Sequence, residues 1–252
     1  MILALVLCLA TVVCQSALAA PMLRIAAASD LRFAMEAILE QFRDKYPDYD
    51  VTVVYGSSGR FHSQIENGAP FDLYFSADIA YPMSLKEAGL VAGEVMPYGR
   101  GRLVLWSRTL DVTDMTLADL DDPALERIAM ANPRHAPYGA RAREALESAG
   151  VWSAVQPRLV YGENIAQTLQ MADSGAADLG IVALSLVLSP AMAGEGSYHR
   201  IDPRLHQPLE QGFVITSHGK DNATARRFAD FFRQESSRRL LQAYGFEPPG
   251  SD

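Results

Sequence analysis

Short apolar runs alternate along the chain with stretches in which apolar residues recur at helical spacing. The run LRIAAA at residues 23–28 predicts a buried strand, and Leu31, Phe33 and Phe42 after it mark one face of a helix ending near residue 46. Further strands are predicted at residues 51–55, 72–76, 103–106, 128–131, 158–161, 178–184 and 209–216, and further helices at residues 61–68, 81–88, 140–149, 165–174 and 222–244. Such alternation is typical of an α/β fold with mostly parallel sheets and helices on both faces.

Four of these strands lead into helices through small or polar residues. Ser29 follows the first strand, Ser57 and Ser58 follow the second, and Tyr138 and Ile165 lie at the starts of two later helices. The first backbone N–H groups of a helix have no carbonyl partner within it, and the positive end of the helix dipole lies behind them. Each junction therefore predicts a place where an anion can bind.

Helix capping is the alternative interpretation of the serines. Serine is a preferred residue at helix N-termini, where its hydroxyl accepts a backbone N–H of the first turn. On this alternative Ser29, Ser57 and Ser58 serve the local structure alone. The sequence leaves both roles open, and they are compatible because a capping hydroxyl can also face a ligand.

The four junctions divide equally between the two halves of the chain, which predicts two α/β lobes facing one another across a crevice. The chain would cross between the lobes near Gly101 and return near Leu209. We therefore expect one lobe from residues 20–101 together with 210–252, and the other from residues 102–209.

The first nineteen residues are apolar and end in the small-x-small pattern Ala17-Leu18-Ala19, which predicts a secretory signal peptide over residues 1–19. An uncleaved membrane anchor is the alternative. Cys8 and Cys14 both lie in this segment, so a mature chain would contain no cysteine and no disulfide.

The net charge and the candidate reactive residues limit what the protein can bind or catalyse. A net charge of −8 argues against nucleic acid as a partner, and an acidic protein that binds an anion must do so with local dipoles. Asp72 and Asp78 lack the converging ligands that a metal ion needs. Hydrolysis by Ser58 would need a base that the sequence does not offer. We therefore expect a binding protein without a resident cofactor, and not an enzyme.

Six segments carry a family resemblance: AAASDL at residues 26–31, YGSSG at 55–59, QIENGAPFDLYFSAD at 64–78, GRLVLWS at 101–107, NPRHAPYGARAREAL at 132–146 and SGAADLGIVALS at 174–185. In this order they resemble the periplasmic molybdate-binding proteins of ABC transporters, over nearly the whole chain after residue 19. The resemblance implies a type II periplasmic binding-protein fold, in which two lobes close on a tetrahedral oxyanion that is then delivered to a membrane permease.

Carried over position by position, the resemblance assigns the oxyanion to the hydroxyls of Ser29 and Ser58 and to the backbone N–H groups of Tyr138 and Ile165, with the N–H of Asp30 as a further donor. Molybdenum would be held only as molybdate, and tungstate is expected to bind as well. The resemblance further implies a periplasmic protein, and we expect a monomer. A receptor for sulfate or phosphate on the same fold is the alternative.

One position departs from the family pattern. Many members carry a tyrosine ligand directly after the GIV of the late strand, where this chain has Ala183. We expect the hydroxyl of Tyr138 to replace that missing donor. The alternative is that the Tyr138 ring covers the cleft and a water molecule completes the ligand shell.

Overall fold

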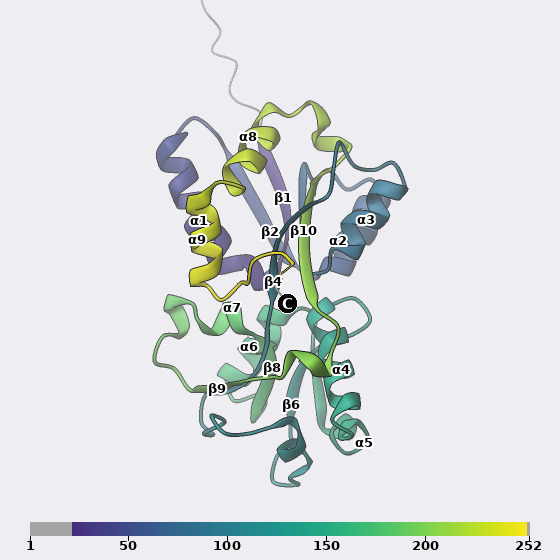
Figure 1. The fold of residues 1–252 in the computed structure, drawn as a ribbon, viewed down its shortest axis with the longest axis vertical. Coiled ribbons are helices and arrows are strands. Elements are labelled where there is room, and N and C mark those ends of the chain that lie inside the picture. Colours follow the sequence, from purple (N-terminus) through teal and green to yellow (C-terminus); the bar gives the residue numbers. More distant parts are fainter. Residues whose placement is uncertain (1–21, 251–252) are drawn as a thin grey trace, which may run out of the picture.

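The computed structural model describes residues 22–250, which form two lobes stacked along the long axis of the molecule (Figure 1). The expected signal peptide at residues 1–19 lies outside the described residues. Within the described part, no helix combines the length and the apolar character needed to cross a membrane.

The first lobe is built on a five-stranded sheet in the order β2-β1-β3-β10-β4. Its strands are β1 (Leu23–Ala28), β2 (Val51–Gly56), β3 (Leu73–Ser76), β4 (Met96–Gly101) and β10 (Leu209–Ile215). Strands β2, β1 and β3 are parallel, whereas β10 runs antiparallel to β3 and β4. The sheet is therefore mixed, with a parallel part next to an antiparallel part.

Helices cover both faces of this sheet, because successive residues of a strand point to opposite sides. Ile25 packs with α1 (Arg32–Lys45), α8 (Ala223–Phe232) and α9 (Glu235–Ala243). Ala26 packs on the other face with α2 (Ser58–Glu66) and α3 (Ala80–Glu87). Burial on both sides explains why the strand LRIAAA is almost continuously apolar.

The second lobe repeats this plan with the strand order β7-β6-β8-β5-β9. Its strands are β5 (Leu103–Ser107), β6 (Ile128–Ala131), β7 (Leu159–Gly162), β8 (Leu179–Ala183) and β9 (Ser197–Arg200), and its helices are α4 (Pro137–Ser148), α5 (Trp152–Val155), α6 (Ile165–Asp173) and α7 (Leu184–Val187). Strands β7, β6 and β8 are parallel, and β5 is antiparallel to β8 and β9. One continuous apolar core fills this lobe.

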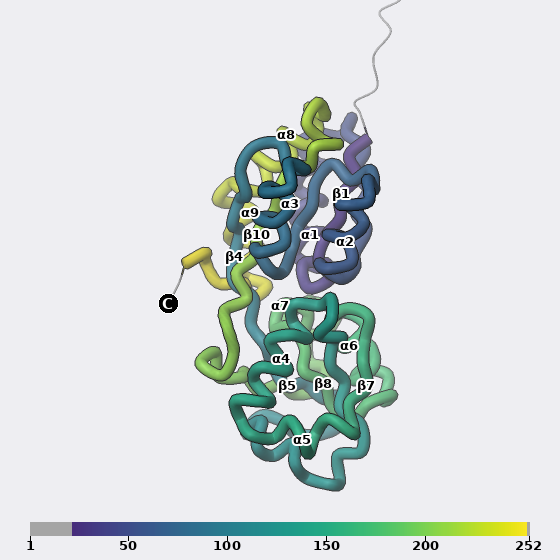
Figure 2. The backbone as a smooth tube through the Cα atoms, turned by 90° about the vertical axis from the view of Figure 1, so that its right-hand side faces the viewer, coloured from purple at the N-terminus to yellow at the C-terminus, as the bar shows by residue number. Residues whose placement is uncertain are grey.

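Two segments join the lobes side by side, as Figure 2 shows. The chain passes from β4 to β5 through Arg102, and it returns into β10 after residues 201–208. The Arg102 guanidinium is fixed at this crossing by the carboxylate of Glu247, with Nε–Oε1 and Nη2–Oε2 distances of 2.6 and 2.5 Å. Both connections lie along the sheet edge formed by β10 and β4. The carboxyl ends of the parallel strands β2, β1 and β3 therefore lie on the other side of the interface.

One sequence prediction was wrong in detail, and two strands were missed. The final helix is two helices, α8 and α9, separated at Gln234, and the hydroxyl of Ser237 after the break donates to the carbonyl of Phe231 at 2.9 Å. Strand β4 was not predicted because its sequence MPYGRG contains proline and glycine, which an edge strand tolerates. Strand β9 was not predicted, because its sequence SYHR has little apolar character.

Candidate functional site

All four predicted junctions meet at one small pocket between the lobes. Its lining residues are Ala28, Ser29, Asp30, Gly56, Ser57, Ser58, Ala77, Ala136, Pro137, Tyr138, Asn164 and Ile165. The five residues predicted to bind the oxyanion are therefore brought together, and each of them is at least 95% buried. Strands β1 and β2 deliver their residues from one lobe, and β6 and β7 deliver theirs from the other.

None of the three serines accepts a hydrogen bond from the helix that begins beside it, so the interpretation that they serve the local structure alone is wrong. Ser29 accepts a hydrogen bond at 3.3 Å from the N–H of Ala166 in the opposite lobe, and the N-cap position of α1 is Leu31. Ser58 accepts the N–H of Ala77 at 3.0 Å. Neither hydroxyl donates a hydrogen bond to another residue of the 22–250 range, so both hydroxyl hydrogens are left for a ligand.

Ser57 differs from Ser58 in this respect. Ser57 occupies the N-cap position of α2, but its hydroxyl donates to the backbone carbonyl of His135 across the cleft. Its hydrogen is therefore used in joining the lobes. Of the two neighbouring serines, Ser58 is the one with a donor still available.

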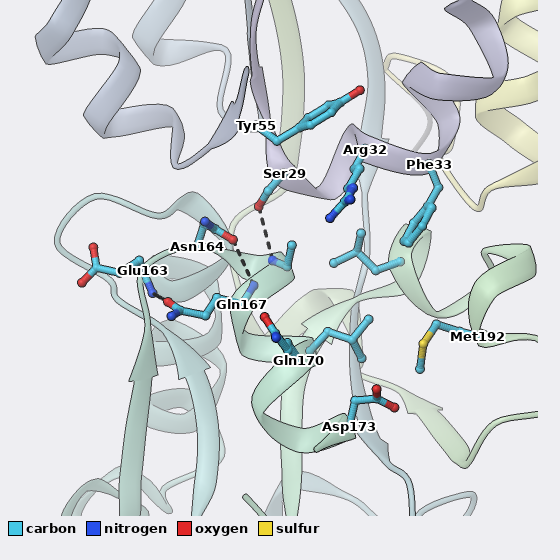
Figure 3. A pocket seen from close by; sticks show the side chains of 13 residues that line it. Ser29, Arg32, Phe33, Tyr55, Glu163, Asn164, Gln167, Gln170, Asp173 and Met192 are labelled. Atoms are coloured by element: carbon cyan, nitrogen blue, oxygen red, sulfur yellow. Dashed lines mark hydrogen bonds between the residues drawn. The ribbon is translucent and has the colours of Figure 1, made fainter. Parts of the chain in front are cut away.

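The first turn of α6 has one N–H group to spare. The N–H of Gln167 is accepted by the side chain of Asn164 at 3.0 Å, and the N–H of Ala166 is accepted by Ser29 (Figure 3). The Thr168 N–H bonds to the carbonyl of Asn164 at 3.1 Å. Only the N–H of Ile165 is left in this turn, and it lies at the pocket.

The first turn of α4 also exposes donors to the pocket. Pro137 opens the helix and has no N–H, so Tyr138 supplies the first one. Gly139 allows this turn to press against the end of β6, because a Cβ atom at Gly139 would lie 2.1 Å from the Ala131 carbonyl oxygen. Glycine is therefore required where α4 starts.

The hydroxyl of Tyr138 is not available as a ligand, contrary to our expectation. It donates to Oδ2 of Asp30 at 3.0 Å and accepts from the Gln211 amide at 3.1 Å. The same amide donates to Asp30 Oδ2 at 2.7 Å, and the hydroxyl of Tyr98 donates to the Gln211 side-chain oxygen. The phenol thus belongs to a buried network beside the interlobe crossing, and it does not replace the tyrosine missing at Ala183.

Burial dominates the electrostatics of this network. It raises the pKa of Asp30 to about 6, although the hydrogen bonds from Gln211 and Tyr138 pull in the opposite direction. Burial also raises the pKa of the Tyr138 hydroxyl, and the neighbouring Asp30 carboxylate adds to that effect. Oδ1 of Asp30 has no hydrogen-bond partner within the described residues.

Positive side chains are absent from the lining of the pocket. Arg60, the basic residue nearest to the junctions in sequence, has a 55% exposed side chain and forms an ion pair with Glu163 across the cleft. Over residues 22–250, no three His, Cys, Asp or Glu side chains are grouped so that they could hold a metal ion. The pocket therefore offers neutral hydrogen-bond donors to an anion.

Sequence reasoning missed the residues that hold the lobes together around the site. The carbonyl of His135, in the loop before α4, accepts from the N–H of Gly59 at 2.9 Å and from the Ser57 hydroxyl. Gln211 could not have been found, because it lies 181 positions from Asp30 in the sequence. Asn164 had a local signal, since Asn is a preferred N-cap residue before an apolar helix.

The raised pKa of Asp30 predicts a dependence of stability on pH. A folded-state pKa near 6, against 3.8 for the free side chain, means that the folded chain binds more protons between these values. The free energy of unfolding should therefore fall as pH rises from 4 to 7, by up to about 3 kcal/mol. Asp30→Asn removes this contribution, so urea titrations should show the variant gaining stability relative to the wild type over that range. A difference in the free energy of unfolding between the two proteins that does not change with pH would contradict the assigned pKa.

Comparison with known proteins places the chain in a family. Residues 23–247 match the family described as bacterial extracellular solute-binding protein. The molybdate-binding protein ModA of Azotobacter vinelandii is 38% identical, covering 88% of each chain. The ModA protein of Escherichia coli is 29% identical, covering 87% of this chain and 86% of its own.

Solved structures agree in fold. The periplasmic molybdate-binding protein of Azotobacter vinelandii superposes with a TM-score of 0.84 at 31% identity, covering 90% of this chain and 99% of its own. The sulfate-binding protein SubI of Mycobacterium tuberculosis superposes with a TM-score of 0.71 at 16% identity, covering 90% and 86%, which is a likeness of fold alone. By sequence and by fold, this chain belongs to the bacterial extracellular solute-binding proteins.

Proposed function

We propose that this protein captures molybdate between its two lobes in the periplasm and delivers it to the permease of an ABC transporter. The observation that carries the proposal is the convergence of donors with no partner of their own: the hydroxyls of Ser29 and Ser58 and the N–H groups of Tyr138 and Ile165. A tetrahedral oxyanion offers an acceptor in each of the directions from which these donors come. The relatives named as molybdate-binding proteins support the choice of anion.

The same hydrogen-bond donors should also bind tungstate. Tungstate has the same tetrahedral shape and charge as molybdate, so the donors should hold it equally well.

Membership of the solute-binding family implies a binding role rather than a catalytic one. Within the described residues, the polar partner of the Ser58 hydroxyl is the Ala77 N–H, so no base activates it as a nucleophile. We further propose that the protein acts as a monomer, because each chain carries a complete site.

Removing either serine hydroxyl should weaken molybdate binding. Hydrogen bonds to a charged acceptor contribute about 1.5 to 3 kcal/mol, so Ser29→Ala and Ser58→Ala should each raise the dissociation constant roughly tenfold or more. Isothermal titration calorimetry measures the effect. Ser63→Ala, on the exposed side of α2, is the matched control and should bind like the wild type. Wild-type affinity in both pocket variants would show that the site is elsewhere.

Molybdate should bind far more tightly than sulfate or phosphate. A smaller oxyanion cannot reach the donors of both lobes at once, which leaves buried N–H groups unpaired at about 1 to 3 kcal/mol each. Competition titrations against bound molybdate rank the three anions. Equal affinity for sulfate would favour the sulfate receptor instead.

Gly59→Ala should weaken binding without destabilising the free protein. A Cβ at Gly59 would lie 2.7 Å from the carbonyl oxygen of His135 in the opposite lobe, so the variant should resist closure. Alanine is also a better helix former than glycine, by about 1 kcal/mol, and Gly59 lies in α2. Calorimetry should therefore show a higher dissociation constant, while the melting temperature of the free protein stays level or rises. A lower melting temperature with unchanged affinity would contradict this role.

A further inference from the structure

Contacts between the two lobes close the pocket on two sides. Beside the crossing segments, Tyr138 bonds to Asp30, and the Ser185 hydroxyl donates to the Asp30 carbonyl at 2.8 Å. At the start of α2, Gly59 bonds to the carbonyl of His135, and Arg60 pairs with Glu163. An anion has to reach the pocket by a route that these contacts leave open.

A larger cavity of about 580 Å³ opens on a third side, between the start of α1 and the outer face of α6 (Figure 3). It shares Ser29 and Asn164 with the small pocket, so the two are adjacent. Lobe 1 contributes Tyr55, Arg32 and Phe33 to its wall, and lobe 2 contributes the amides of Gln167 and Gln170. We call this cavity the vestibule.

Arg32 is the one basic residue in the wall of the vestibule. Figure 3 shows its guanidinium directed into the cavity, toward α6. Its recorded contact is an approach to the Phe33 ring at 5.9 Å, and it enters no ion pair with a described residue. Its positive charge is therefore not compensated by a contacting carboxylate.

The acidic residues of the wall are each engaged elsewhere. Glu163 pairs with Arg60, and Oδ1 of Asp173 lies 2.6 Å from Nη2 of Arg108. Glu36, one helical turn beyond Arg32, does not line the vestibule; it accepts the Tyr55 hydroxyl at 2.8 Å and keeps its negative charge. The vestibule is thus a place where an acidic protein, with a net charge of −8, presents an unpaired positive charge beside its anion pocket.

We propose that the vestibule is the entrance to the site and that Arg32 holds the incoming oxyanion there in an encounter complex. The inference rests on the proposed function and adds an entry step to it. A negatively charged protein repels a dianion at long range, whereas a local positive charge at the mouth raises the anion concentration where it is needed. Arg32 does not line the inner pocket, so it should change the association rate, and through it the dissociation constant, while the dissociation rate stays the same.

Arg32→Gln tests this assignment when association and dissociation are measured separately. Rapid filtration with radiolabelled molybdate gives the association rate, and a chase with unlabelled molybdate gives the dissociation rate. At low ionic strength the variant should associate roughly three- to tenfold more slowly, with dissociation unchanged within about twofold. The deficit should fade as salt shortens the Debye length toward about 3 Å at 1 M. Arg32→Lys keeps the charge and should keep most of the rate.

Arg43→Gln is the matched control, because it removes the same charge from the exposed far end of the same helix, about 16 Å away. It should associate at nearly the wild-type rate. Equal slowing in both Gln variants, or an Arg32→Gln defect confined to dissociation, would overturn the encounter role while leaving the proposed function intact. Wild-type protein that takes up no molybdate would overturn the proposed function, and this inference with it.

Discussion

The structure depends on a constraint of the polypeptide backbone: the first N–H groups of a helix cannot be paired within that helix. In this chain, strand ends place such groups at one point between two lobes, where some of them are paired by a side chain of the same turn or by a group of the facing lobe. The first turn of α6 illustrates this, because Asn164 and Ser29 take two N–H groups and leave that of Ile165. An anion at this point would supply the acceptors that these free N–H groups lack.

The lining of the pocket contains no cationic side chain, and its free donors are backbone N–H groups and serine hydroxyls. Donors without net charge can hold a dianion when their dipoles converge on it, and they impose a size because they are fixed by two rigid sheets. The buried network of Asp30, Tyr138 and Gln211 sets the spacing of the lobes on the side of the crossing segments. Gly101 lies against this network, since a Cβ there would come within 2.1 Å of the Tyr138 hydroxyl. A cationic side chain, Arg32, is found outside the pocket, where solvent can still reach it.

Sequence patterns could predict the parallel strands and the four junctions, because burial on both faces and helix starts leave local signals. They could not predict β4 and β9, whose edge positions free them from the usual apolar pattern. They placed Ser29 and Ser58 at the junctions and left open the alternative that both only cap helices, an alternative that the long-range contacts of their hydroxyls exclude. The Tyr138 hydroxyl was misassigned for the same reason, since its partners Asp30 and Gln211 are distant in sequence and become neighbours only in the fold.

The most direct measurement of the central claim is a crystal structure of the protein with molybdate. Oxyanion oxygens should lie at hydrogen-bonding distance, about 2.7 to 3.2 Å, from Oγ of Ser29 and Ser58 and from the N atoms of Tyr138 and Ile165. No Lys or Arg side chain should contact the anion. A molybdate held instead by Arg32 or Arg60, or located away from the four junctions, would contradict it.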